Sequence, residues 1–366
     1  LKTCQRASLD ESCLFNKLEE SALLHDKHLV DYLSKPSERA HNCMILFNTW
    51  HQEANNFFFP MQKKKCEFNG GMFIRFGGKG IAINPGRGFL EGLYQKKFSL
   101  LDIDYVIVTH SRKEIVHDIA RIYDLALELN TVLGKSHVIH YYFNRVAYQE
   151  MTQILKPRYR QDKNTLHCLE IYLDTPDVER IELGNGLTLQ YFLTSKSYNP
   201  ISPHELNLGI KLDMHDGKLK RSIAYIGSAH WTPLLAQHIG KVDILITGFG
   251  NTKKTDLEKE SYLDDSLGYF GTLTLLEESP PHLAMISEFD QRIAGGRLEI
   301  IRKLRDNLSH RDTTILPSDP DLLIDLNHIE IQCSITEDWI DPSLAKIVQG
   351  SHPLDCLQFL SPKSYI

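Results

Sequence analysis

The sequence lacks a long hydrophobic run: no apolar stretch approaches the ~18 residues that a membrane-spanning helix needs. It contains no Cys-x-x-Cys pair, and its 7 cysteines are scattered and odd in number. That pattern is more typical of free thiols in a reducing compartment than of disulfides or a structural zinc site. Residues 1–10 contain no signal-peptide core. We therefore expect a cytoplasmic protein with no membrane partner.

Neither sign of charge dominates the composition. The 41 Lys+Arg and 47 Asp+Glu residues give a net charge of -6, which argues against general binding to nucleic-acid phosphates. With 366 residues, 42% of them hydrophobic, the chain can form one large domain or two. No linker rich in Gly, Ser or Pro divides it. We expect a helical extension over 1–38, a single domain over 40–335, and a tail over 336–366 that packs on the domain.

The spacing of apolar residues predicts alternating strands and helices. Helical spacing covers 11–34, 115–130, 144–155, 232–239 and 296–308, and strand patterns cover 43–50, 72–76, 80–83, 105–108, 137–140, 221–226, 242–247 and 283–286. The strand over 105–108 is uncharged and β-branched, as expected of a strand buried on both faces. His110 follows its carboxyl end, where open α/β sheets place their chemistry.

Five motifs resemble, in order, those of the metallo-β-lactamase superfamily. They are the glycine-rich hairpin ending in Asn84-Pro85-Gly86 and followed by Thr109-His110; Pro203-His204; Tyr225 to Ser228; Asp243 to Thr247; and Leu267 to Gly271 with Ile286 to Phe289. The resemblance covers about residues 42–333. It implies an α/β (α+β) fold, a four-layer αββα sandwich of two mixed β-sheets with a metal site at one edge.

The resemblance also implies three histidines and two carboxylates around one or two cations, usually Zn, that activate a water. Read against the superfamily's Thr-His-x-His-x-Asp-His, the chain keeps His110 but carries Arg112, Glu114 and Ile115 at the other ligand positions. Isoleucine cannot ligate a metal. The fixed charge of Arg112 would repel a dication by several kcal/mol at ~4 Å.

Three further positions differ from the superfamily pattern. Ser228 stands at the bridging carboxylate of Gly-Asp-Thr, Asn84 at the Asp of Asp-Pro-Gly, and Ser266 where the most similar group has a histidine. We therefore expect a degenerate, ligand-depleted member without a cofactor. Its function would be that of a catalytically inactive binding, sensing or assembly module, with a pocket at the former metal site.

A metal-dependent hydrolase with an altered, mononuclear site is the alternative. His110, His204 and Glu114 would make a His₂-carboxylate set for Zn or Mn, and His230 is a further catalytic candidate. The substrate class would be a phosphodiester, a nucleotide or a related ester.

The expected ligand-binding residues are Arg87, Arg112, Ser228 and Trp231. Guanidinium groups suit phosphate and carboxylate, so the two arginines could line a pocket for a small anion. An internal ion pair with Glu114 or Glu91 remains the alternative for them. Trp231 could fill the emptied cavity. The expected partner is a small anionic ligand or another protein.

His117 and Asp118 also offer ligand-type side chains. On a helix that starts near residue 115, however, Asp118 lies in the first turn, where the helix dipole favours a carboxylate. We expect His117 to face solvent and Asp118 to support the structure around the site.

Overall fold

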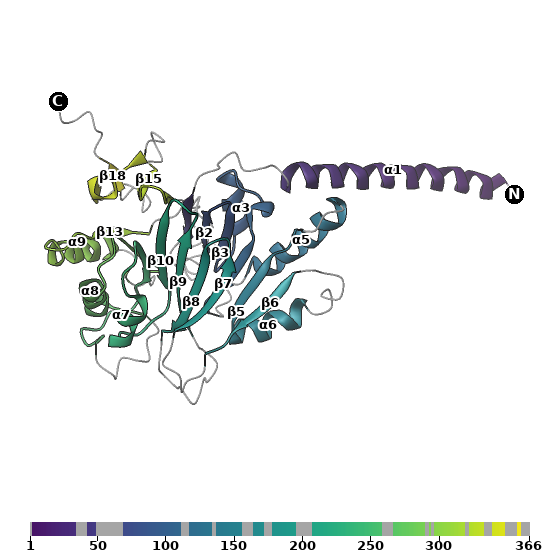
Figure 1. Ribbon diagram of the computed structural model, residues 1–366. Helices are drawn as coiled ribbons and strands as arrows, with labels where there is room; N and C mark the ends of the chain where they lie inside the picture. The colour runs from purple at the N-terminus through teal and green to yellow at the C-terminus, as the bar shows by residue number, and fades with distance from the viewer. Residues whose placement is uncertain are drawn as a thin grey trace, which may run out of the picture.

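Two mixed β-sheets lie face to face in the computed structural model, with helices over their outer faces (Figure 1). The structure describes residues 2–33, 42–48, 69–110, 117–133, 137–155, 164–171, 178–194, 207–257, 266–289, 293, 296–318, 322–332, 339–347 and 357–359. This arrangement is the four-layer αββα sandwich that the sequence predicts.

The first sheet has nine strands among the described residues. Its spatial order is β16 (Trp339–Ile340), β15 (Glu330–Gln332), β14 (Leu322–Asp325), β1 (Cys43–Asn48), β2 (Asn69–Phe76), β3 (Lys79–Ile83), β4 (Tyr105–Val108), β5 (His140–Asn144) and β6 (Thr165–Leu169). Strands β3 to β6 run parallel to one another, and the others pair antiparallel. Because β16 pairs with β15, the sheet continues past residue 335.

The second sheet has seven strands in the described part of the chain. Its order is β13 (Thr314–Pro317), β12 (Leu283–Ser287), β11 (Ile244–Gly248), β10 (Lys220–Ile226), β9 (Leu208–His215), β8 (Leu187–Leu193) and β7 (Glu179–Gly184). Strands β10 to β13 are parallel, so their carboxyl ends meet at one edge. Strands β17 (Ala345–Ile347) and β18 (Leu357–Phe359) form a separate pair.

Three apolar cores hold the four layers together. The inner core lies between the sheets and includes Ile107, Leu189 and Tyr225. Helices α3 (Phe89–Gln95), α5 (Ile119–Leu133) and α6 (Arg145–Leu155) cover the first sheet, whereas α7 (Pro233–Ile239), α8 (Tyr269–Glu278) and α9 (Arg297–Asn307) cover the second. Short 3₁₀ helices η1 (Leu100–Asp102) and η5 (Pro342–Leu344) complete the elements.

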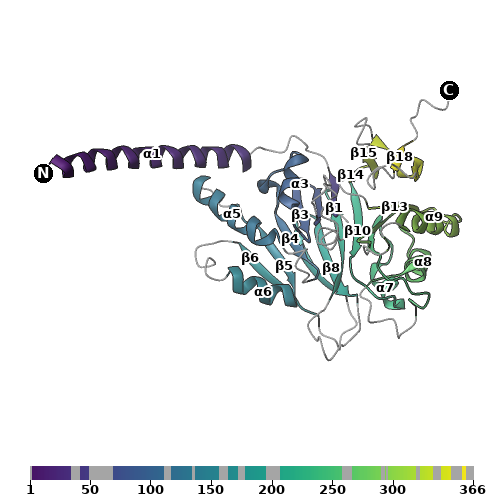
Figure 2. The same cartoon turned by 180° about the vertical axis from the view of Figure 1, so that it is seen from behind.

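Helix α1 (Lys2–Leu33) projects from the body in both ribbon views, with its C-terminal end near α5 (Figures 1 and 2). There His25 Nε2 lies 3.4 Å from Glu128 Oε1. Several apolar side chains farther along α1 are more than half exposed, namely Leu14, Phe15, Leu18, Leu23 and Leu24. Within the part of the chain that the structure describes, no helix is both long and apolar enough to cross a membrane.

Most predicted elements are present, with shifted ends. The predicted helix over 11–34 is α1 and begins nearer the N-terminus, and the fully buried strand over 105–108 is β4. The helix predicted over 115–130 is α5, which begins at Ile119, and the Asp118 carbonyl accepts the Ile122 N–H at 2.8 Å. The strand predicted over 137–140 instead begins at His140.

Candidate functional site

The carboxyl ends of β3, β4, β10 and β12 meet at one edge of the sandwich, which we call the carboxyl edge. Asn84 follows β3, His110 lies just after β4, Ser228 follows β10 and Glu288 follows β12. The two sheets touch here, because the Leu208 N–H of the second sheet donates to a carbonyl of the segment after β4 at 3.0 Å. In this fold class, such an edge is where functional side chains gather.

A hydrogen-bonded chain crosses between the sheets at this edge. The backbone N–H of Thr109 donates to Asn84 Oδ1 at 2.9 Å. Asn84 Nδ2 then donates to Thr109 Oγ1 at 2.9 Å and to the Tyr225 hydroxyl at 3.1 Å. The Tyr225 hydroxyl donates in turn to Glu288 Oε1. Asn84, Thr109 and Tyr225 are all buried, so the chain runs through the interior.

The first bond fixes the orientation of the Asn84 amide. A backbone N–H can only donate, so the atom of Asn84 that faces Thr109 N must be the amide oxygen. The amide nitrogen therefore faces Tyr225 and occupies one of its acceptor positions. The Tyr225 hydroxyl can then donate its single proton to Glu288 Oε1. An aspartate at position 84 could not donate to Tyr225 in this way.

Backbone geometry at the carboxyl edge is unusual. Asn84 has φ 51° and Glu288 has φ 48°, both in the left-handed region that side-chain-bearing residues avoid. Asparagine tolerates this conformation, whereas for glutamate it costs about 1–3 kcal/mol. A Cβ on Gly227 would lie 2.2 Å from the Tyr225 hydroxyl, so glycine is required beside this series of hydrogen bonds. Strain of this kind persists only where surrounding contacts enforce it.

Three of the expected site residues are buried at this edge. His110 is 2% exposed, and its Nδ1 lies 2.9 Å from Thr109 Oγ1. His230 is 4% exposed, and its backbone N–H donates to the Thr194 carbonyl at 3.1 Å. Ser228 is 2% exposed, and its hydroxyl has no hydrogen-bond partner among the described residues. A water or a ligand oxygen could complete the hydrogen bonding of this hydroxyl.

The other expected ligand-binding residues are distributed differently. Arg87 is exposed on the turn before α3. Glu91, one of its suggested partners, forms its ion pair with Arg121, which lowers the Glu91 pKa against the opposing effect of burial. Trp231 packs with the outer core beneath α7 and α8. Arg112, Glu114 and His204 lie outside the described residues, so their predicted roles stay predictions.

Asp118 is a structural residue of the kind expected. It is buried, and its Oδ2 accepts the Leu90 N–H at 3.3 Å while its own N–H donates to the Pro85 carbonyl at 3.2 Å. These bonds fix the start of α5 against the loop that carries Asn84. His117 is largely exposed, as predicted, with Nδ1 3.2 Å from Asp118 Oδ1.

A small cavity of about 20 Å³ lies near the same edge, and a space of that size holds about one water. Its lining consists of Asn144, Arg145, Leu169, Glu170, Ile171, Leu193 and Leu208. Cys168 lies beside it on β6. Burial, reinforced by the Glu170 charge, raises the pKa of the Cys168 thiol to about 11. This thiol therefore stays protonated near neutrality and is a poor nucleophile.

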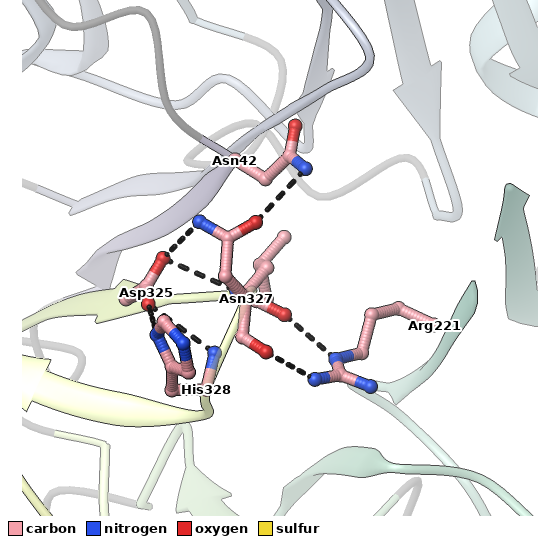
Figure 3. Close-up of polar contacts among 6 residues, drawn as sticks. Asn42, Arg221, Asp325, Asn327 and His328 are labelled. Carbon is pink, nitrogen blue, oxygen red and sulfur yellow. Dashed lines mark hydrogen bonds and ion pairs between the residues drawn. The ribbon is translucent and has the colours of Figure 1, made fainter. Parts of the chain in front are cut away.

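A second group of ligand-type residues lies at the opposite edge, in the turn between β14 and β15 (Figure 3). Asp325, His328 and Glu330 bring one ligand atom each within 4.8 Å of one another. Asp325, however, is already saturated. Its Oδ1 accepts from Asn327 N and Nδ2 at 3.1 and 2.8 Å, and its Oδ2 lies 3.2 and 2.9 Å from His328 N and Nδ1. These bonds define a side-chain-capped turn.

The same turn ties the two sheets together (Figure 3). Arg221 of β10 donates from Nε to the Leu326 carbonyl at 2.6 Å and from its terminal nitrogen to the Asn327 carbonyl. Asn42 Nδ2 lies 3.2 Å from both Asn327 Oδ1 and Asp216 Oδ2. Formation of this turn and bonding between the sheets thus explain why ligand-type residues gather at the opposite edge.

A scan against protein-family models found no match, and neither did a search of curated proteins. Solved structures, in contrast, match over most of the chain. The metallo-β-lactamase fold protein YhfI from Bacillus subtilis has a TM-score of 0.55 at 12% identity, covering 78% of this chain and 99% of that one. A diphosphatase from the PhnP family has a TM-score of 0.52 at 12% identity, covering 78% and 98%.

Unliganded yeast PDE1 is a third similar structure, with a TM-score of 0.50 at 11% identity, covering 76% of this chain and 98% of that one. At identities this low the likeness establishes the fold and nothing finer. The chain has the metallo-β-lactamase fold, as its sequence motifs predict.

A dinuclear zinc centre does not fit the described residues of the carboxyl edge. The Asn84 oxygen accepts the Thr109 N–H and its amide protons face Tyr225, and Ser228 offers a neutral hydroxyl where the superfamily pattern has a carboxylate. No group of three His, Cys, Asp or Glu ligand atoms lies there within the described residues, whose one such group is at the opposite edge.

No sequence pattern predicts a role for Tyr225 or Glu288, which complete the series of hydrogen bonds between the sheets. Both lie in motifs used for the fold prediction. Glu288 comes directly after a fully buried strand, and His110 comes two residues after another. A charged residue in such a position indicates a candidate site residue. Nothing local to Tyr225 shows that its hydroxyl joins residues 141 and 63 positions away.

Proposed function

We propose that this chain is a non-catalytic binding module with the metallo-β-lactamase fold. The carboxyl edge would bind a small anionic ligand where related enzymes have a metal centre. The observation that carries this proposal is the chain of hydrogen bonds from Asn84 through Tyr225 to Glu288. The Asn84 amide and the Tyr225 hydroxyl are bonded inside the protein, and neither presents an anionic ligand to a metal.

Two features support a ligand in place of a metal. The Ser228 hydroxyl is buried without a partner among the described residues, so a water or ligand oxygen can complete its hydrogen bonding. Arg87 is exposed three residues after the buried Asn84, and guanidinium groups pair well with phosphate or carboxylate. Arg112 and Trp231 complete the proposed ligand-binding set, and a protein that presents an acidic side chain is the second kind of partner.

A metal-dependent hydrolase remains the second candidate. It is favoured by two buried histidines, His110 and His230, near one edge of a fold shared with a PhnP-family diphosphatase and yeast PDE1. In that case His110, His204 and Glu114 would hold one Zn or Mn, which would supply an activated water.

Two assays separate the candidates. The first follows hydrolysis of bis(p-nitrophenyl) phosphate with Zn²⁺ or Mn²⁺ added. We expect no turnover above that of a His110→Ala variant, and metal-dependent turnover that this variant loses would contradict the proposal.

The second assay is calorimetric titration with inorganic pyrophosphate. Arg87→Ala and Arg112→Ala should each weaken binding about tenfold, as expected for the loss of one charge-assisted contact. Arg180→Ala is the matched control, because Arg180 pairs with Glu182 on an exposed edge strand. Equal binding by all variants would rule out the proposed anion site.

A further inference from the structure

Two histidines lie together on the last two strands of the first sheet, β5 and β6. His140 pairs directly with Thr165 across these strands, and His167 is two residues beyond Thr165 on β6. Successive side chains alternate between faces of a strand, so all three residues share the face that carries Tyr142 of the inner core. His140 is half-buried and His167 is exposed, so solvent reaches the pair.

The two imidazoles aim at one point. His140 Nδ1 lies 2.6 Å from Thr165 Oγ1, and His167 Nε2 lies 3.1 Å from the same oxygen. The rings are nearly parallel, with centroids 6.3 Å apart and planes at 24°. Tyr105 stacks on His140 at 5.7 Å, and Tyr142 stacks on His167 at 4.7 Å. Both rings are therefore held in orientation before any ligand arrives.

A hydroxyl group can bond to both rings only when the two converging nitrogens are in different protonation states. Thr165 has one proton, so at most one of the two converging nitrogens can offer it a lone pair, and the other must point an N–H at the oxygen. A metal ion, in contrast, accepts both lone pairs. Among the described residues the second nitrogen of each ring makes no hydrogen bond, so the ring protons can move there. Neutral imidazole favours Zn²⁺, Cu²⁺ and Ni²⁺ over harder cations.

We propose that His140 and His167 bind one transition-metal ion at the β5–β6 edge, with Thr165 supplying an oxygen ligand. The ion would join the outermost strand of the sheet to its neighbour. This site is separate from the carboxyl edge, because His140 begins β5 and the carboxyl edge lies at the strand's other end. The inference does not rest on the proposed binding function.

The test is titration of the full chain with Cu²⁺, followed by calorimetry and by electron paramagnetic resonance. We expect about one equivalent bound, with coupling to two imidazole nitrogens. His140→Gln and His167→Gln should each weaken binding about tenfold or more, and the double variant should lose it. Bound Cu²⁺ should also raise the Tm of the parent but not of the double variant.

Two controls keep the result interpretable. His328→Gln alters the exposed histidine of the opposite edge and should leave binding unchanged. Thr165→Val keeps both histidines and should retain binding within about tenfold, and circular dichroism checks that each variant folds. The proposal is overturned if the parent binds no Cu²⁺, if the double variant binds as the parent does, or if His328→Gln is the variant that loses the ion.

Discussion

At the carboxyl edge, Asn84 of the first sheet reaches Glu288 of the second through the hydroxyl of Tyr225. At the opposite edge, Arg221 of the second sheet reaches the carbonyls of Leu326 and Asn327 in a turn of the first. Both edges thus join the sheets with polar bonds. They differ in burial and in the kind of residue that each one uses.

Residue type alone would place a metal at the opposite edge. The opposite edge has Asp325, His328 and Glu330 close together, yet the Asp325 carboxylate is fully used by its own turn. The carboxyl edge has Asn84 and Ser228 where the superfamily pattern has carboxylates. A ligand site is therefore better recognised from unused hydrogen-bonding capacity than from a count of ligand-type side chains.

The largest expected effect comes from Asn84→Asp. The introduced carboxylate and Glu288 would compete for the single proton of Tyr225, and two carboxylates that share a site repel each other. We expect a loss of about 3 kcal/mol in the free energy of unfolding at pH 7, measured by urea denaturation. The loss should shrink as the pH falls toward about 4, because one carboxyl then takes up a proton.

The matched control for this change is Asn84→Asp combined with Glu288→Gln. The neutral amide removes the repulsion, so most of the lost stability should return in a double-mutant cycle. If Asn84→Asp alone is as stable as the parent at pH 7, the assigned proton directions are wrong.

Tyr225→Phe should have the next largest effect. It removes the hydroxyl that accepts from Asn84 and donates to Glu288, so we expect a loss of about 2 kcal/mol. Tyr191→Phe is the control, because its hydroxyl makes a long 3.4 Å bond to the Glu170 carbonyl and should cost about 0.5 kcal/mol. Equal losses in urea denaturation would show that the cross-sheet chain adds nothing specific.

Arg221→Met tests the opposite edge. The variant keeps the apolar stem and loses the bonds to two backbone carbonyls, so we expect a loss of about 1–2 kcal/mol by thermal or urea denaturation. Arg180→Met, which breaks an exposed pair with Glu182, should cost less than about 0.5 kcal/mol. An Arg221→Met loss greater than that of Tyr225→Phe would reverse the ranking of the two edges.

The smallest effect is expected at Asp256, which caps α8 by accepting the Gly271 N–H at 2.8 Å. Burial raises the Asp256 pKa above its usual value, with the backbone bonds opposing it. Ionisation therefore costs more in the folded state, and this carboxyl reduces stability as the pH rises through the range where it ionises.

Asp256→Asn should remove that pH dependence and change stability by less than about 1 kcal/mol at pH 7, because the amide oxygen still caps the helix. Denaturation curves between about pH 4 and 7 measure it. Asp256→Ala, which loses the cap, should be about 1 kcal/mol less stable than Asp256→Asn at every pH. A parent stability that rises relative to Asp256→Asn over this range would contradict the assigned direction of the pKa shift.

The fold could be predicted because its signals are local and ordered along the chain. The buried strand over 105–108, the glycine-rich hairpin and the amphipathic helices each follow from a few neighbouring residues, and their order matches one known architecture. The residues expected to be non-ligands, Asn84 and Ser228, also lie at the predicted edge. The order of the motifs along the sequence was sufficient to predict that these two residues lie at the same edge.

The cross-sheet chain could not be predicted, because its partners are remote in sequence and its logic depends on hydrogen-bond direction. Glu288 can be recognised as a charged residue after a buried strand. Its connection to Asn84 cannot, because the two side chains are joined only through the hydroxyl of Tyr225. The His140, Thr165 and His167 group was missed for a similar reason. It depends on the β5–β6 register, which no local pattern specifies.

The metal content of a His140→Gln, His167→Gln variant tests most directly the proposal that the carboxyl edge holds no catalytic metal centre. This background removes the proposed β5–β6 site, so any remaining metal reports on the rest of the molecule. Elemental analysis after incubation with Zn²⁺ or Mn²⁺ and removal of free ion should find well below one equivalent per chain. About one or two retained equivalents, lost on His110→Ala, would contradict the account.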